Sequence, residues 1–174
     1  IMQTLQYKIP VISLGKDTMK SYLNLGIIMK TKIKNIKALI RSKINPANPK
    51  LNIILTELEE VLHSYKVNPM KKANILKVVH LLRSLESTLK LFLQENGIPF
   101  SGHSSMGKFF HIYNNHNYRT IGNIDSSELN RYINNLSNYR NQFMHNAGEY
   151  PTNERVINNL LSEIEICLIR ILNL

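Results

Sequence analysis

The sequence predicts an all-α fold, an antiparallel bundle of about five helices over residues 17–174, preceded by an irregular arm over residues 1–16. Three observations support this prediction. Apolar residues recur at spacings of three and four, the period of an amphipathic helix. The alternation of apolar and polar residues that marks a strand is missing. Short segments with Pro, Gly or Asn separate the periodic stretches, and short connections make neighbouring helices antiparallel.

The first helix is expected over residues 17–44, with the side chain of Asp17 capping its first turn. Pro46 and Pro49 stop this helix, because proline lacks the amide hydrogen that a helix interior needs. The predicted inward stripe consists of Leu23, Ile27, Ile33, Ile36, Leu39 and Ile40.

The second and third helices each begin at an Asn-Pro pair, in which asparagine caps the helix and proline occupies its first turn. Asn48-Pro49 starts the second helix, Asn68-Pro69 starts the third, and Asn96-Gly97 ends the third. The predicted inward residues of the second are Leu51, Ile54, Leu55, Leu58, Val61, Leu62 and Tyr65. Those of the third are Ile75, Val78, Val79, Leu82, Leu85, Leu89 and Phe92. A solvated face is predicted for Glu57, Glu59 and Glu60.

Residues 97–124 are expected to form the longest irregular stretch, and loops of this length are commonly functional. Aromatic and basic residues at 108–113, with Tyr118-Arg119 beyond them, either stack on single-stranded RNA or pack onto the bundle. Packing is the preferred interpretation. The closely spaced cysteine or acidic ligands of a zinc site are missing beside His103, His111 and His116. No metal is therefore expected.

The fourth helix opens with a capping box at Asp125-Ser126-Ser127-Glu128 and ends near Ala147-Gly148. Pro151-Thr152 is expected to begin the fifth helix, whose inward residues are Val156, Leu160, Leu161, Ile164, Cys167, Leu168, Ile171 and Leu172. The single cysteine, Cys167, is interpreted as a core residue. One cysteine and the lack of a signal-peptide pattern at residues 1–8 favour a reducing, cytoplasmic setting.

The charge of the chain is strongly uneven. The net charge is +10, but residues 1–90 carry 16 Lys and Arg against 5 Asp and Glu, whereas residues 91–174 carry 6 against 7. This excess favours a polyanionic partner such as RNA over a solvated helix face. Candidate RNA contacts on the first helix are Lys32, Lys34, Lys37 and Arg41. An anionic membrane surface is the less favoured alternative to nucleic acid, and no apolar run reaches the roughly 18 residues of a membrane span. No membrane partner is therefore expected.

Arg140 occupies a position at which the apolar stripe of the fourth helix should continue. The stripe around it consists of Leu129, Ile133, Leu136, Phe143 and Ala147. A buried unpaired charge is costly, so the guanidinium needs an anion or an interface between subunits. Glu86 lies beside the apolar stripe of the third helix and is one candidate ion-pair partner.

Asn141 and His145 lie four residues apart and share a helix face, which the long side chain of Arg140 can also reach. Arginine binds phosphate oxygens, histidine transfers protons near neutral pH, and asparagine orients the histidine or holds the substrate. With the 2′-hydroxyl of RNA as nucleophile, no metal or other cofactor is required. The Arg–His spacing alone is common by chance. In an equally weighted alternative, Arg140 reaches solvent and His145 is an ordinary helix-end histidine.

The pattern Arg140-Asn141-x-x-x-His145, late in a helical bundle, resembles the R-polar-x4–6-H signature of the HEPN superfamily. The resemblance implies a HEPN-like bundle and a metal-independent endoribonuclease in which two motif copies face each other across a homodimer. It implies that Arg140 stabilises the pentavalent phosphate, that His145 acts as general acid or base, and that Asn141 supports them.

Many HEPN proteins are toxins or antiphage-defence effectors, so an antitoxin or regulatory partner is a further expectation. One branch carries a modified tyrosine two residues after the histidine. This chain has Ala147 there, and that control is not expected. Two alternatives remain: a catalytically silent HEPN-like module that binds nucleotides, RNA or a partner, and a plain basic helical domain that binds nucleic acid.

Overall fold

The computed structural model describes residues 16–64, 70–116, 120–146 and 148–174, and it confirms the all-α fold. The helices are α1 (Lys16–Lys43), α2 (Pro49–His63), α3 (Met70–Glu95), α4 (Met106–Asn115), α5 (Ser126–Tyr132), the π-helical segment η2 (Ile133–Ser137), α6 (Asn138–His145) and α7 (Glu154–Ile171). No strand occurs in these ranges. The predicted irregular arm lies outside them, apart from Lys16, which is the first residue of α1.

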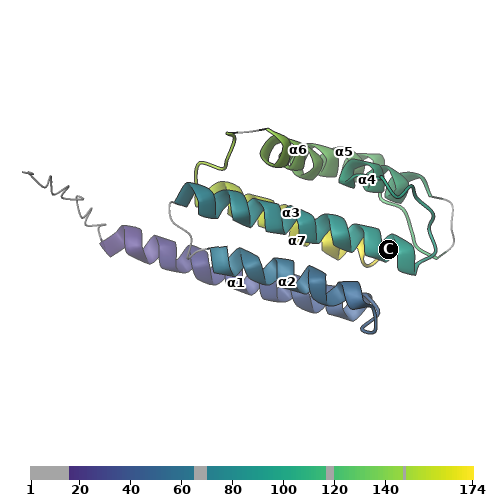
Figure 1. Cartoon of the computed structure of the whole chain (residues 1–174), viewed down its shortest axis with the longest axis horizontal. Helices are drawn as coiled ribbons and strands as arrows, with labels where there is room; N and C mark the ends of the chain where they lie inside the picture. The colour runs from purple at the N-terminus through teal and green to yellow at the C-terminus, as the bar shows by residue number, and fades with distance from the viewer. Residues whose placement is uncertain (1–15, 65–69, 117–119, 147) are drawn as a thin grey trace, which may run out of the picture.

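The helices form three layers (Figure 1). α1 and α2 make the first layer, α3 and α7 the second, and α4, α5 and α6 the third. The middle layer contacts both others, since α3 packs on α2, α6 and α4, and α7 packs on α1. None of the described helices combines the length and the apolar character that a bilayer span requires.

The central position of α3 explains why its buried surface is wider than one stripe. Leu81, Leu91 and Leu93 are buried in addition to the predicted Leu82, Leu85 and Leu89. Two buried hydroxyls on α3 bond to carbonyls of the preceding turn, Ser84 to Leu81 and Thr88 to Ser84. Because each hydroxyl has a hydrogen-bond partner within the helix, both side chains can be buried.

The inward stripe of α1 differs in one respect from the prediction. Ile33, Ile36 and Ile40 are buried as expected, and Met29 and Ile44 extend the stripe. Ile27, predicted to face inward, is 57% exposed. Ile27 lies two residues before the buried Met29, about 200° round the helix axis, so it faces away from the stripe.

The predicted caps of α2 and α3 are confirmed where they are described. The side chain of Asn48 accepts a hydrogen bond from the amide of Lys50, and Pro49 begins α2. At the end of α3, Gly97 adopts a φ of 68°, a conformation that glycine tolerates at a helix C-terminus. Tyr65 and Asn68-Pro69 lie outside the described residues.

The stretch expected to be irregular contains the helix α4, so this part of the prediction is wrong. Met106, Phe109, Phe110 and Tyr113 are buried, at helical spacing, and the hydroxyl of Tyr113 donates to the carbonyl of Leu89 at 2.7 Å. The aromatic residues therefore pack onto the bundle, which was the preferred interpretation. Tyr118-Arg119 lies outside the described residues. The helical pattern spans only ten residues, between segments rich in Gly, Ser and Asn, and was too short to identify.

The predicted fourth helix is interrupted by a π-helical turn. The capping box at Asp125 and Glu128 is present as expected. Further along, the amide of Asn138 donates to the carbonyl of Ile133, five residues earlier, which defines the π-turn η2. Gly107 of α4 lies against this turn, since a Cβ there would stand 3.1 Å from the Ser137 hydroxyl oxygen.

The last helix begins later than predicted. Asn153 caps it by accepting from the amide of Val156, so α7 starts at Glu154 and not at Pro151-Thr152. The carbonyl of Pro151 accepts from the side chain of Asn74 instead. Cys167 is fully buried, as expected, and burial raises the pKa of its thiol well above the usual range.

A buried ion pair joins α3 to the first turn of α7. Lys77 is 1% exposed, and its ammonium donates to the carboxylate of Glu154, which is also buried. Removing one member of such a pair leaves the other charge desolvated without its counterion, which costs more than the pair itself contributes.

We therefore expect Lys77→Met to lower the free energy of unfolding by about 3–5 kcal/mol. The double variant Lys77→Met/Glu154→Leu should recover most of this loss. Arg131→Met, which removes one member of the exposed pair with Glu163, is the control and should cost about 1 kcal/mol or less. Urea denaturation measures all three, and equal losses in the two single variants would contradict the role of burial.

Candidate active site

Arg140 forms an ion pair with Glu86 across the α3–α6 contact. The Nε of Arg140 donates to the Oε2 of Glu86 at 2.9 Å, and each side chain is about one-fifth exposed. The predicted partner is therefore confirmed. It also supplies the reason for an arginine on an apolar stripe, because the carboxylate on the same chain meets the guanidinium at the edge of the core. The position of Arg140 by itself does not require a second subunit.

Arg140 also contacts His145 directly. Its Nη1 lies 2.8 Å from the Nε2 of His145. A guanidinium only donates, so in this arrangement Nε2 accepts and the imidazole is neutral, with its proton on Nδ1. His145 is exposed and is the last residue of α6, so a substrate has access to the ring. The guanidinium of Arg140 thus links the partly buried carboxylate of Glu86 to the exposed imidazole of His145.

Asn141 is exposed on α6, and its side chain forms no hydrogen bond with the described residues. It is free to contact a ligand beside His145, but no interaction within the chain positions it. Its supporting role stays a prediction.

Glu86 connects a third element to this pair. Its Oε1 accepts a hydrogen bond at 3.0 Å from the amide of Met106, the first residue of α4. A surface hollow of about 300 Å³ adjoins the same carboxylate. It is lined by Arg83, Glu86, Ser87, Lys90, Ser104 and Phe109.

The four predicted RNA contacts on α1 do not form one surface. Lys32 reaches α7, where it bonds to Ser162 and lies 3.8 Å from Glu165. Lys37 pairs with Glu59 of α2, and this hydrogen bond lowers the pKa of the glutamate. Lys34 and Arg41, seven residues apart, are exposed and form no ion pair with the described carboxylates. Only these two remain available to a polyanion.

The three histidines of the 97–124 stretch are not brought together. His103 and His111 are exposed, whereas His116 is buried and its Nε2 contacts the carbonyl of Gly122 at 2.7 Å. Across the part of the chain that the structure describes, no cluster of His, Cys, Asp and Glu is suited to hold a metal ion.

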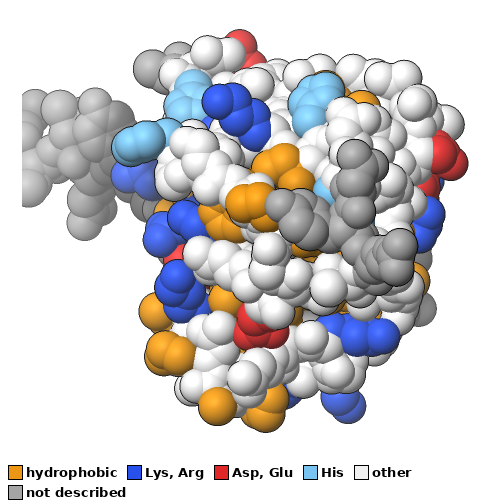
Figure 2. All heavy atoms as spheres, turned by 90° about the vertical axis from the view of Figure 1, so that its right-hand side faces the viewer, with side chains coloured by type: hydrophobic (Ala, Val, Ile, Leu, Met, Phe, Trp, Pro, Cys, Tyr) orange, Lys and Arg blue, Asp and Glu red, His pale blue; other side chains and the backbone are white. Residues whose placement is uncertain are grey.

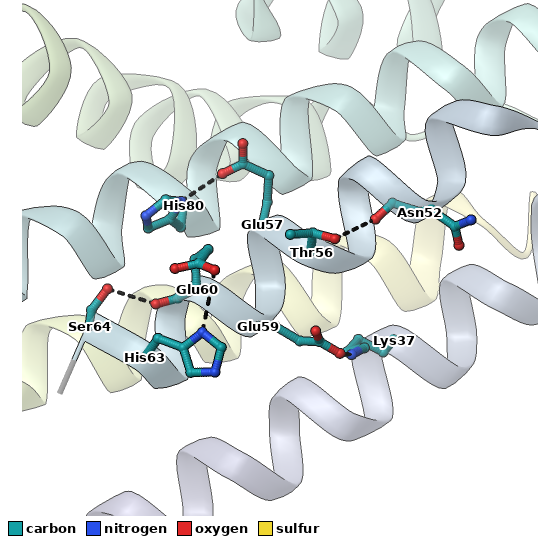
Figure 3. A network of polar contacts seen from close by, with 9 residues as sticks. All are labelled: Lys37, Asn52, Thr56, Glu57, Glu59, Glu60, His63, Ser64 and His80. Atoms are coloured by element: carbon teal, nitrogen blue, oxygen red, sulfur yellow. Dashed lines mark hydrogen bonds and ion pairs between the residues drawn. The ribbon is translucent and has the colours of Figure 1, made fainter. Parts of the chain in front are cut away.

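A second polar cluster on α2 and α3 was not predicted. Glu57 accepts from His80 at 2.7 Å and from Arg83 at 2.9 Å (Figure 3 shows the pair with His80). Its side chain is 15% exposed, so its assignment to a solvated face was wrong. Glu59 points away from it, toward Lys37 of α1 (Figure 3). The spacing of His80 and Arg83 on one face of α3 was the available signal.

We expect the Glu86–Arg140 contact to be energetically coupled. Glu86→Ala and Arg140→Ala should each lower the free energy of unfolding by about 1–3 kcal/mol, because hydrogen bonds to charged groups are lost. A double-mutant cycle by urea denaturation should give a coupling energy of about 0.5–3 kcal/mol. The matched cycle of Glu86 with Arg131, which pairs with Glu163 instead, should be additive. Additivity in the first cycle would contradict the ion pair.

No family model matches the sequence, and the comparisons found no curated protein and no solved structure with significant similarity to it. The function is therefore inferred from Arg140, His145 and the residues around them.

Proposed function

We propose that the protein is a metal-independent endoribonuclease of the HEPN type, with Arg140 and His145 as its catalytic residues and Asn141 in support. The observation that carries the proposal is the 2.8 Å contact between the Arg140 guanidinium and the exposed imidazole of His145. An anion binder and a proton-transfer group share one position, as phosphodiester cleavage requires.

The chemistry follows from the substrate's own nucleophile. The neutral Nε2 of His145 takes the proton of the RNA 2′-hydroxyl, whose oxygen forms a bond to the adjacent phosphorus. The bond from phosphorus to the 5′-oxygen breaks, which leaves a 2′,3′-cyclic phosphate and a 5′-hydroxyl. Arg140 binds the phosphate oxygens as negative charge develops on them, and a phosphate oxygen then replaces Nε2 as an acceptor of its hydrogen bonds.

The leaving 5′-oxygen needs a proton, and one chain supplies one His145. We propose that a second copy provides this general acid in a homodimer, as the HEPN resemblance implies. The exposure of His145 at the end of α6 leaves it accessible to a second subunit. The same resemblance, with the basic chain, leads us to propose RNA as substrate, a toxin or antiphage-defence role in the cytoplasm, and control by an antitoxin or regulatory partner.

The second candidate is a catalytically silent module that binds RNA. The pairing of Arg140 with Glu86 favours it, because the carboxylate competes with phosphate for the guanidinium. In this case RNA binding persists and cleavage does not occur.

We expect wild-type protein to cleave total RNA in the presence of EDTA. Arg140→Ala and His145→Ala should each reduce the rate by about a hundredfold or more, because each removes a group that acts in the transition state. Gel electrophoresis of the RNA, with analysis of the cyclic phosphate ends, measures this.

Two matched variants control for structure. Arg131→Ala removes an arginine from the same helical segment that is likewise paired to a glutamate. His63→Ala removes an exposed histidine from the last position of α2, as His145 occupies that of α6. Both should retain activity. Cleavage that survives both site substitutions would exclude these residues, and RNA binding without any cleavage would favour the silent module.

We expect the active species to be a dimer. Sedimentation velocity should show a dimer, and activity per chain should fall on dilution below its dissociation constant. A monomer at high concentration that is fully active would rule out the composite site.

A further inference from the structure

Two surface hollows flank one face of α3, and Glu86, the partner of Arg140, lines one of them. Arg83, Ser87, Lys90 and Gln94 follow one another at spacings of three and four, so they lie on one face of this helix. The hollow beside Glu86 lies on the α4 side of this face. A second hollow of about 290 Å³ lies on the α2 side, where Lys50 and Ile53 line it. Ser87 and Lys90 line both hollows, so the two adjoin along this face of α3 and are together called the groove.

The cations of this groove are only partly neutralised. Glu57 pairs with Arg83, and Glu86 is occupied by Arg140 and the amide of Met106. Lys50 and Lys90 form no ion pair with any carboxylate that the structure describes. Two ammonium groups without an ion-pair partner, both lining the groove, attract an anion with more than one charge.

Apolar and aromatic groups border the same groove. The ammonium of Lys90 lies 6.0 Å from the ring centre of Phe100, which packs edge-on against Phe109 at 5.3 Å. Ile53 is 64% exposed beside Lys50. Figure 2 views the end of the molecule where α2 begins and α3 ends, and Lys and Arg side chains lie next to hydrophobic ones on its left side.

We propose that this groove, lined by Lys50, Ile53, Arg83, Ser87, Lys90 and Gln94, binds single-stranded RNA that flanks the scissile phosphate. Lys50 and Lys90 contact phosphates, and Ile53 covers the face of a base. Alternating cations and apolar surface fit an unpaired strand, whose phosphates and bases are both accessible. Arg83 to Gln94 span about 16 Å along α3 at 1.5 Å per residue. At about 3.4 Å per stacked nucleotide, this length accommodates several nucleotides. This inference rests on the proposed ribonuclease function.

The test measures binding separately from cleavage. A fluorescein-labelled 12-nucleotide RNA with 2′-O-methyl groups cannot be cleaved, and its anisotropy reports affinity at several salt concentrations. The double variant Lys50→Ala/Lys90→Ala should bind at least tenfold more weakly, and its salt slope should be smaller by about 1.4, at about 0.7 per phosphate contact. The control Lys43→Ala/Lys72→Ala removes two exposed lysines outside the groove and should stay within twofold of wild type.

Ile53→Ala separates the apolar contact from the charges. It should weaken binding about threefold or more with an unchanged salt slope, whereas Ile166→Ala, which trims an exposed isoleucine on α7, should have no effect. Thermal unfolding of each variant verifies that it is folded.

His145→Ala should bind this RNA as tightly as wild type. Weak binding by the groove variant, in a protein that never cleaves RNA, would support the groove and reject the ribonuclease. Normal binding by the groove variant, or a loss equal to that of the control, would overturn the groove while leaving cleavage unaffected. Displacement of the RNA by poly-glutamate at equal charge concentration would overturn RNA as the occupant in favour of an acidic peptide.

Discussion

The carboxylate of Glu86 is the interaction on which the candidate site depends. One oxygen binds the guanidinium of Arg140 on α6, and the other accepts from the first amide of α4. Through one side chain, the central helix α3 thus holds both neighbouring elements of the third layer. The Nη1 of the same guanidinium contacts the exposed ring of His145. The guanidinium that we propose as phosphate binder is thus held by Glu86, and its contact with His145 is the one that a phosphate would replace.

The burial of α3 accounts for much of the polar organisation of the bundle. A helix covered by α2, α4, α6 and α7 has few positions at which charge reaches water. The charged groups on it are paired where they are covered, as Lys77 is with Glu154. Lys90 instead forms no ion pair with the described carboxylates and lines the hollow beside Glu86. The proposed groove thus takes much of its lining from the same helix that organises the core.

The excess of basic residues is distributed differently from what its density along the chain suggested. The lysine-rich α1 uses Lys32 and Lys37 to hold α7 and α2, so part of its charge serves packing between layers. The groove beside the candidate site instead takes its cations from α2 and α3, with Lys50 and Lys90. The net charge favoured a polyanionic partner. The surface available to such a partner depends on which cations already form ion pairs within the fold.

The sequence by itself determined the longer helices, because helix formation depends on local signals. The cap at Asn48, the capping box at Asp125 and the stripes of α2 and α3 follow from residues within one or two turns. It also identified Arg140 and His145 as a candidate pair, and Glu86 as one candidate partner of Arg140. The short α4, the π-turn at Ile133–Ser137 and the cluster around Glu57 were decided only by the tertiary structure. These features depend on surfaces that meet across distant parts of the chain, and an ion pair between residues 54 positions apart exists only once its two helices have packed.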